Sequence, residues 1–329
     1  MVTLCLAAGC VTTPDFGADD DEDKDDEDVS IPLRRDEIQT FYERAKDPRE
    51  FWITVYSSPE GPVFRGDHRT HPNQEEELEF LTDNESDVPV VQTKTGRMHL
   101  HPFLIDTTSA ETWVDLETAS AMRLAPLGMP AYGTTPVHVE DDISGFLCIA
   151  PTLKAGILHV ESVLMFVRGA KGPLGPLARD VTDPVPDGVF GTRFLEIFSY
   201  VEFDFPNRNV VLSSTKTYKP DAVRLLATVP FSTADGYLTV EGTMDERPTS
   251  FVVDTAGDYT ILMPDMEGTL VRSLRIGDLL VENVTVTANT ETDLALTDLA
   301  RIGTRLLSRF KMTLDFKERV VHFEQPAKS

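Results

Sequence analysis

The chain has 329 residues, of which 41% are hydrophobic and 26% are charged, so it holds enough apolar material for one large domain or two lobes. Its formal charge of −25, from 55 acidic and 30 basic side chains, argues against nucleic-acid binding, because phosphate contacts need clustered Lys and Arg. The same sign argues against attraction to an anionic membrane surface. The sequence also lacks the run of about 20 apolar residues that would predict a spanning helix.

Residues 1–10, MVTLCLAAGC, form a short apolar run that ends in small residues before Cys10. The run is similar to the end of a bacterial lipoprotein signal, although no basic segment precedes it, and a frayed apolar terminus is the alternative. The resemblance implies a bacterial cell-envelope protein that meets the membrane only through a lipid on Cys10. Val11, rather than an aspartate, follows the cysteine, which favours the outer membrane.

Residues 11–30 are dominated by acidic side chains. Between Asp15 and Asp28 there are ten carboxylates, with Lys24 as the single base. Like charges at this density repel one another and cannot bury apolar surface, so we expect a disordered, solvated tether. The segment lacks the spaced ligands and the glycine of a calcium loop, which argues against a calcium site.

Residues 31–87 are expected to form an N-terminal extension. Apolar residues at helical spacing predict a helix over residues 36–45, and the apolar run at 51–56 predicts a strand. The polar segment 57–87, rich in Pro, His and Glu, is expected to be a loop.

Two pairs of histidines are possible metal ligands. His68 and His71 lie in the polar segment, and His99 and His101 alternate along an expected strand. Neither pair has a third ligand close by in the sequence, so we interpret all four as ordinary surface residues and expect no metal site.

From residue 88 onward, short β-type runs alternate with turn signals, and an internal repeat becomes visible. Residues 188–212 match residues 300–323, which predicts two homologous lobes, 88–215 and 216–329. The matching pairs are Gly191–Gly303, Thr192–Thr304, Arg193–Arg305, Leu195–Leu307, Phe198–Phe310, Asp204–Asp315, Phe205–Phe316, Arg208–Arg319 and Val210–Val321. Asp204 and Asp315 each precede Phe and a turn, so we interpret them as structural turn formers.

A second matching pair lies upstream of each copy. Residues 102–109 and 250–257 are apolar strands that end in Asp106-Thr107 and in Asp254-Thr255. A pseudo-two-fold axis would bring the two aspartates face to face, where they would share one proton. One carboxylate could then activate a water as a base while the other donates to a carbonyl oxygen. This chemistry needs no metal, cofactor or covalent intermediate, and none is expected.

Over about residues 88–324 the sequence resembles the aspartic peptidases, in particular a pair of bacterial retropepsin-like units fused in one chain. The arrangement is similar to that of pepsin-like enzymes, with one flap over a two-lobed cleft. The resemblance implies a mostly β fold with two homologous acid-protease-like β-barrel lobes, related by a pseudo-two-fold axis, and a cleft between them. It implies that Asp106 and Asp254 are the catalytic dyad and that Thr107 and Thr255 exchange hydrogen bonds between the lobes. Gly191 and Gly303 end the two apolar-apolar-Gly elements that support the dyad, and Arg301 stands where the second element is normally apolar.

The family's glycine after Asp-Thr is replaced by Thr108 in the first lobe and Ala256 in the second. Glycine there lets the backbone N–H approach the carboxylate, and β-branched threonine is bulkier. Two functions therefore stay open. The chain is an aspartic-type endopeptidase acting on an extended peptide or protein, or an inactive pseudo-peptidase that binds a peptide or an envelope partner in the same cleft. A monomer suffices for either site, and the oligomeric state stays open.

The spacing between the repeated elements differs in the two lobes. From Asp106 to Gly191 is 85 residues, and from Asp254 to Gly303 is 49. The longer excursion has room for one flap over the cleft, and Tyr132-Gly133 resembles the tip of the tyrosine-bearing flap of pepsin-like enzymes. An ordinary surface turn is the alternative.

Overall fold

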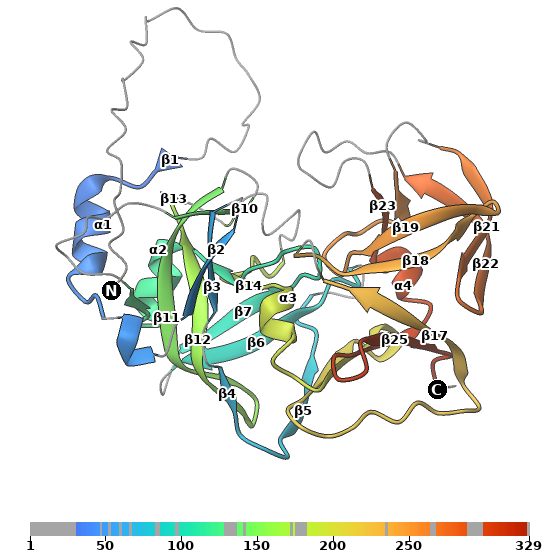
Figure 1. Ribbon diagram of the computed structural model, residues 1–329, viewed down its shortest axis with the longest axis horizontal. Helices are drawn as coiled ribbons and strands as arrows, with labels where there is room; N and C mark the ends of the chain where they lie inside the picture. The colour runs from blue at the N-terminus through green and yellow to red at the C-terminus, as the bar shows by residue number, and fades with distance from the viewer. Residues whose placement is uncertain are drawn as a thin grey trace, which may run out of the picture.

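The computed structural model in Figure 1 describes most of the chain from residue 31 onward, mainly as strands. The described ranges are 31–46, 48–51, 54–58, 61–65, 68–82, 86–95, 99–127, 137–140, 143–171, 174, 183–233, 236–263, 268–287 and 299–327. Cys10, the acidic segment and the flap candidate Tyr132-Gly133 lie outside these ranges. Within them, no helix combines the length and the apolar character that crossing a bilayer requires.

The first lobe is a closed barrel, seen on the left of Figure 1. Its six strands, in order of pairing, are β6 (Val90–Thr95), β7 (His99–Ile105), β14 (Gly188–Phe190), β8 (Trp113–Val114), β12 (Leu158–Arg168) and β11 (Ile143–Ala155). The barrel closes because β11 pairs with both β12 and β6. Three short strands extend it, β4 (Arg69–Thr70) on β12, and β9 (Ala125–Pro126) and β10 (Val137–Glu140) on β11.

The second lobe repeats this barrel, on the right of Figure 1. Its six strands are β18 (Thr239–Met244), β19 (Arg247–Val253), β23 (Ala300–Ile302), β20 (Ile261–Leu262), β22 (Leu279–Thr287) and β21 (Leu270–Ile276). It closes because β18 pairs with both β19 and β21. The chain is thus mostly β, with two closed six-stranded barrels, which confirms the expected fold class.

A six-stranded central sheet joins the two lobes. In order it contains β5 (Glu75–Glu79), β16 (Asn209–Ser213), β15 (Tyr200–Asp204), β24 (Lys311–Asp315), β25 (Val320–Glu324) and β17 (Leu225–Ser232), and β17 also pairs with β18 of the second barrel. The matching strands β15 and β24 of the two repeats lie side by side and antiparallel at its centre. A pseudo-two-fold relation between the repeats follows from this pairing, because the matching hairpins β15–β16 and β24–β25 extend to opposite sides of the central strand pair.

The two repeats make the same turn after their central strands. Asp204 accepts hydrogen bonds from the backbone N–H and side-chain amide of Asn207, at 3.2 and 2.9 Å. Asp315 accepts from two backbone N–H groups, both at 3.0 Å. Arg208 and Arg319 follow in left-handed backbone conformation, at φ 56° and 55°. The interpretation of both aspartates as turn formers is confirmed.

The N-terminal extension contains more strand than the sequence predicts. The expected helix is α1 (Arg35–Tyr42), whose Phe41 and Tyr42 are buried, and the expected strand is β2 (Thr54–Ser58), with bounds shifted toward the C-terminus. The expectation of a loop over 57–87 was wrong. This segment includes β3 (Gly61–Arg65), which pairs with β2, as well as β4 and β5. Other short elements include β1 (Ile31–Pro32), which pairs with β13 (Ala170–Lys171), η1 (Pro48–Phe51), α2 (Leu116–Ala121) and η4 (Phe205–Asn207).

Strand β5 escaped sequence analysis because four of its five residues are glutamates. It is an edge strand whose one partner among the described strands is β16, and its one apolar residue, Leu78, is its buried one. Edge strands tolerate and even favour charged side chains, since one side of their backbone faces solvent. The Lys216 ammonium and the Tyr200 hydroxyl hydrogen-bond Glu75 and hold the pKa of that carboxyl below its usual value.

Candidate functional site

In both lobes the strand that leads to the Asp-Thr turn lies parallel to the short strand that ends in glycine. In the first lobe β7 pairs with β14, and in the second β19 pairs with β23. This pairing fixes the backbone of each aspartate. The Asp106 N–H donates to the carbonyl oxygen of Phe190 at 3.0 Å, and the Asp254 N–H donates to that of Ile302 at 2.9 Å.

Gly191 and Gly303 begin the short helices α3 (Thr192–Leu195) and α4 (Thr304–Leu307). A Cβ at Gly191 would lie 2.6 Å from the carbonyl oxygen of Ser109, and a Cβ at Gly303 would lie 2.6 Å from that of Gly257. The following backbone N–H donates to the same carbonyl at 2.8 Å in each lobe. Both positions therefore require glycine, because the backbone there packs directly on the loop that carries the aspartate.

The Asp-Thr turns of the two lobes are hydrogen-bonded to each other. The Thr107 N–H donates to the Thr255 hydroxyl at 3.1 Å, and the Thr255 N–H donates to the Thr107 hydroxyl at 3.2 Å. Each hydroxyl also donates across the interface, Thr107 to the Val253 carbonyl at 2.5 Å and Thr255 to the Ile105 carbonyl at 2.7 Å. Both threonines are fully buried. The aspartates, one Cα–Cα step of about 3.8 Å before each threonine, are therefore held beside the same interface.

Each aspartate is buried and bonded to the backbone N–H two residues further on. Asp106 is 2% exposed, and its Oδ1 accepts from the N–H and hydroxyl of Thr108 at 2.7 and 2.6 Å. Asp254 is 0% exposed, and its Oδ1 accepts from the Ala256 N–H at 3.0 Å. The side chains of Thr108 and Ala256 therefore do not keep the N–H groups from the carboxylates. Ala256 packs instead into an apolar cluster formed mainly by the first lobe.

Tyr259 and Gly257 belong to this site although they were not predicted from the sequence. The buried Tyr259 hydroxyl donates to Oδ2 of Asp254. A Cβ at Gly257 would lie 2.3 Å from the tyrosine ring and 2.9 Å from that same carboxylate oxygen, so only glycine lets the ring lie there. The signal was present in the sequence, since the second turn reads Asp-Thr-Ala-Gly, with its glycine displaced by one position.

An Arg–carboxylate pair ties each short helix to its aspartate loop. Arg193 pairs with the buried Glu111 in the first lobe. Arg305 pairs with Asp258 in the second lobe through two hydrogen bonds of 3.0 Å, which raise the pKa of the arginine. The repeat alignment matched the arginines, but their acidic partners stand five and four residues after the aspartates and so escaped it.

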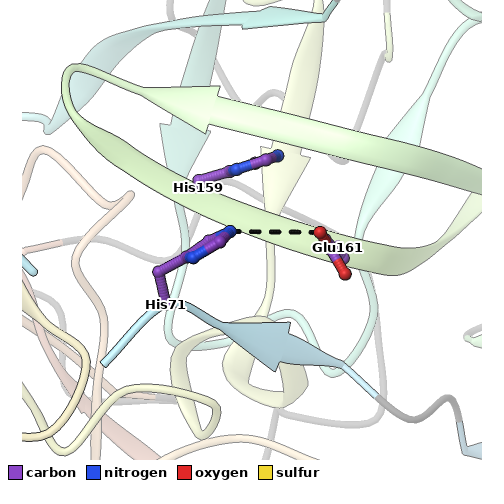
Figure 2. A group of neighbouring side chains, drawn as sticks. All are labelled: His71, His159 and Glu161. Atoms are coloured by element: carbon purple, nitrogen blue, oxygen red, sulfur yellow. Dashed lines mark ion pairs between the residues drawn. The ribbon is translucent and has the colours of Figure 1, made fainter.

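Three further side chains with possible chemistry lie on strands of the two barrels. Buried Arg301 occupies β23, and His101 lies beside Asp187, with Nδ1 and Oδ2 2.8 Å apart. Cys148 is buried, and burial raises the pKa of its thiol, which fits the core rather than a nucleophile. Among the described residues, His71, His159 and Glu161 form a group with the donor atoms of a metal site, on the first barrel (Figure 2).

Comparisons with known proteins add little to this picture. No family model matches the sequence, and no curated protein matches it. The crystal structure of basic 7S globulin from soybean matches with a TM-score of 0.48 and 11% sequence identity, over 77% of this chain and 95% of that chain. The fold assignment rests on the strand pairing described above rather than on this likeness.

Proposed function

We propose that this protein is an aspartic-type endopeptidase in which Asp106 and Asp254 jointly activate a water molecule. One observation carries the proposal. The reciprocal hydrogen bonds of Thr107 and Thr255 hold the two buried Asp-Thr turns against each other between the barrels. A structural role for one aspartate would need no such partner, whereas a shared dyad needs two carboxylates held by a rigid, two-fold frame.

The proposed reaction follows from the proton that the dyad shares. In the proposed dyad the two carboxyls hold one proton between them, so one can act as a base and the other as an acid. The ionised carboxylate takes a proton from water as the water oxygen bonds to the peptide carbonyl carbon. The protonated carboxyl donates to the carbonyl oxygen. When the C–N bond breaks, the carboxyl that took the proton of water gives it to the leaving nitrogen. A hydroxyl of the intermediate returns its proton to the other carboxylate as the C=O bond re-forms, so the dyad again holds one proton.

The hydrogen bonds of the dyad set its geometry. Thr108 donates twice to Oδ1 of Asp106, while Asp254 receives Ala256 on Oδ1 and Tyr259 on Oδ2. These donors fix the plane of each carboxylate without a metal ion. The substrate in this proposal is an extended polypeptide, because a carbonyl must reach both carboxylates between the two lobes.

An inactive, peptide-binding protein is the second candidate, and one specific observation favours it. Both carboxylates are already bonded to a side-chain hydroxyl, Asp106 to Thr108 and Asp254 to Tyr259. In this alternative the hydroxyls fill the positions that a catalytic water would use. The cleft would then supply affinity for a peptide, or for an envelope partner, without cleavage. Anchoring through Cys10 stays a prediction under both candidates.

The test is cleavage of an unfolded, fluorescently labelled polypeptide by the purified chain between about pH 3 and 7. Asp106→Asn and Asp254→Asn should each abolish cleavage, because a shared proton needs both carboxylates. Asp204→Asn is the matched control, since it removes the same charge from a surface turn. Cleavage that survives either dyad variant would reject the proposal. An inert wild type that still binds the polypeptide would favour the second candidate.

A further inference from the structure

A cluster of three metal-ligating side chains lies on the first barrel, outside the dyad. His71 follows β4, and His159 and Glu161 lie on β12 (Figure 2). We propose that these three residues bind a divalent transition-metal ion such as Zn²⁺. The proposal does not depend on the catalytic one, since its three residues belong to β4 and β12 and their ends, whereas the Asp-Thr turns follow β7 and β19.

Strand register brings the three side chains to one face. β4 and β12 are antiparallel, with Arg69 opposite Glu161 and Thr70 opposite Val160. The register continues to His71 and His159, where the His71 N–H donates to the His159 carbonyl at 3.4 Å. Because side chains alternate along a strand, His159 and Glu161 point to the same side, away from the buried Val160. Cross-strand neighbours on one face have Cβ atoms about 5 Å apart.

The donor atoms are already close together. One ligand atom from each of the three residues lies within 4.8 Å of the others. Nε2 of His71 is 3.9 Å from a carboxylate oxygen of Glu161, and the rings of His71 and His159 stack at 4.7 Å with 15° between their planes. Nε2 of His159 is buried and has no hydrogen-bond partner among the described residues. Buried ring nitrogens are nearly always satisfied, so this one points to a ligand.

Coordination needs one local adjustment. A metal ion lies in the plane of each imidazole that binds it, at about 2.0–2.1 Å from nitrogen, so two stacked rings cannot both bind it unturned. The His71 side chain is 51% exposed and that of Glu161 is 45% exposed. Both can therefore turn toward the half-buried His159 without disturbing the core.

The donor set selects the class of metal. Two imidazoles and one carboxylate suit Zn²⁺ and neighbouring transition metals, whereas Ca²⁺ and Mg²⁺ prefer shells of oxygen ligands. Two cations lie nearby in register, Arg69 opposite Glu161 and Lys154 opposite His159. They weaken the attraction for any cation held by charge alone, so binding must come from bonds to imidazole nitrogen. The bound metal would fasten β4 to β12, and so fix the segment that leads into β5.

The experiment titrates the full chain, first stripped with a chelator, with Zn²⁺ alone against a chromophoric chelator. We expect one Zn²⁺ per chain and an increase in the melting temperature. His71→Ala, His159→Ala and Glu161→Gln should each weaken binding by at least about tenfold. His68→Gln is the matched control, because His68 lies three residues from His71 and its Nδ1 contacts the Ser162 carbonyl instead.

The variants should melt like the wild type in chelator, since all three side chains lie outside the core, and this separates lost binding from lost folding. Mg²⁺ should not compete. The proposal would be overturned if Zn²⁺ did not bind, or if the three variants bound it as tightly as the wild type. It would also be overturned if His68→Gln lost as much affinity as those variants, or if Mg²⁺ competed effectively.

Discussion

The Asp-Thr turns of the two lobes share one backbone arrangement but complete it with different side chains. In the first lobe, Thr108 supplies both the N–H and the hydroxyl that bond Asp106. In the second lobe, Ala256 supplies only the N–H, and the hydroxyl comes from Tyr259, five residues after Asp254. The difference shows that the backbone frame is the repeated feature. The hydroxyl donor comes from the turn itself in the first lobe and from a residue of the following loop in the second lobe.

The largest expected effect concerns the glycines that both lobes share. Gly191→Ala and Gly303→Ala should each destabilise the fold by about 3 kcal/mol or more, because the new Cβ would lie 2.2 and 2.5 Å from backbone carbonyl oxygens. Gly268→Ala is the comparison, since nothing lies within 4 Å of a Cβ there and only its positive φ is penalised, by about 1 kcal/mol. Urea unfolding measures all three. Similar losses for all three would show that close packing does not decide these positions.

The threonine interlock should come next. Thr107→Val and Thr255→Val keep the shape of the side chain but leave a buried N–H in the opposite lobe without its hydroxyl acceptor, at about 2–3 kcal/mol each. The double variant should cost less than the sum, because the two hydroxyls lie 3.4 Å apart and join the same pair of turns, so a turn loosened by the first loss gives up less at the second. Thr93→Val, which loses one hydrogen bond within the first lobe, should cost about 1 kcal/mol. Additive losses in the double variant would argue against a reciprocal interlock.

Tyr259→Phe tests the difference between the two turns directly. The ring should stay in place beside Gly257, while Oδ2 of Asp254 loses its hydroxyl donor, at about 1–2 kcal/mol of stability. Thr108→Val removes the hydroxyl from Asp106 but keeps the backbone N–H. If the chain cleaves polypeptide, both variants should lower the cleavage rate and change its pH profile. A change in stability alone would assign the two hydroxyls to packing.

Much of the fold was predictable because the repeat occurs twice in the sequence. Matching the apolar-apolar-Gly segments and the Asp-Thr strands located the elements that pair as β7 with β14 and β19 with β23. Local patterns could not predict β5, since four glutamates favour no strand and only its edge position in the central sheet accepts them.

The missing parts of the candidate sites depended on tertiary structure. Tyr259 reaches Asp254 only because Gly257 leaves room for its ring, and no periodicity encodes that contact. His71 has no third ligand near it in the sequence. His159 and Glu161, 88 and 90 residues further along the chain, lie beside it because of the β4–β12 register. Metal ligands that come together from different strands cannot be recognised from the spacing of residues within one segment.

The smallest expected effect on stability comes from a difference between the two halves of the central sheet. His322 on β25 occupies the position that Val211 has on β16. Burial holds the pKa of His322 below its usual value, although the carboxylates of Asp315 and Glu324 oppose this. The unfolded chain therefore binds a proton that the folded chain resists. The contribution of His322 to stability is complete above the unfolded pKa of about 6.5 and is lost as the pH falls toward the folded value.

His322→Val copies the other repeat and should flatten the decrease in melting temperature between about pH 7.5 and 5.5. It should cost under about 1.5 kcal/mol at pH 7.5, where it removes the Thr228 contact of 2.9 Å. An unchanged pH dependence in this variant would assign the acid sensitivity of the protein to other groups.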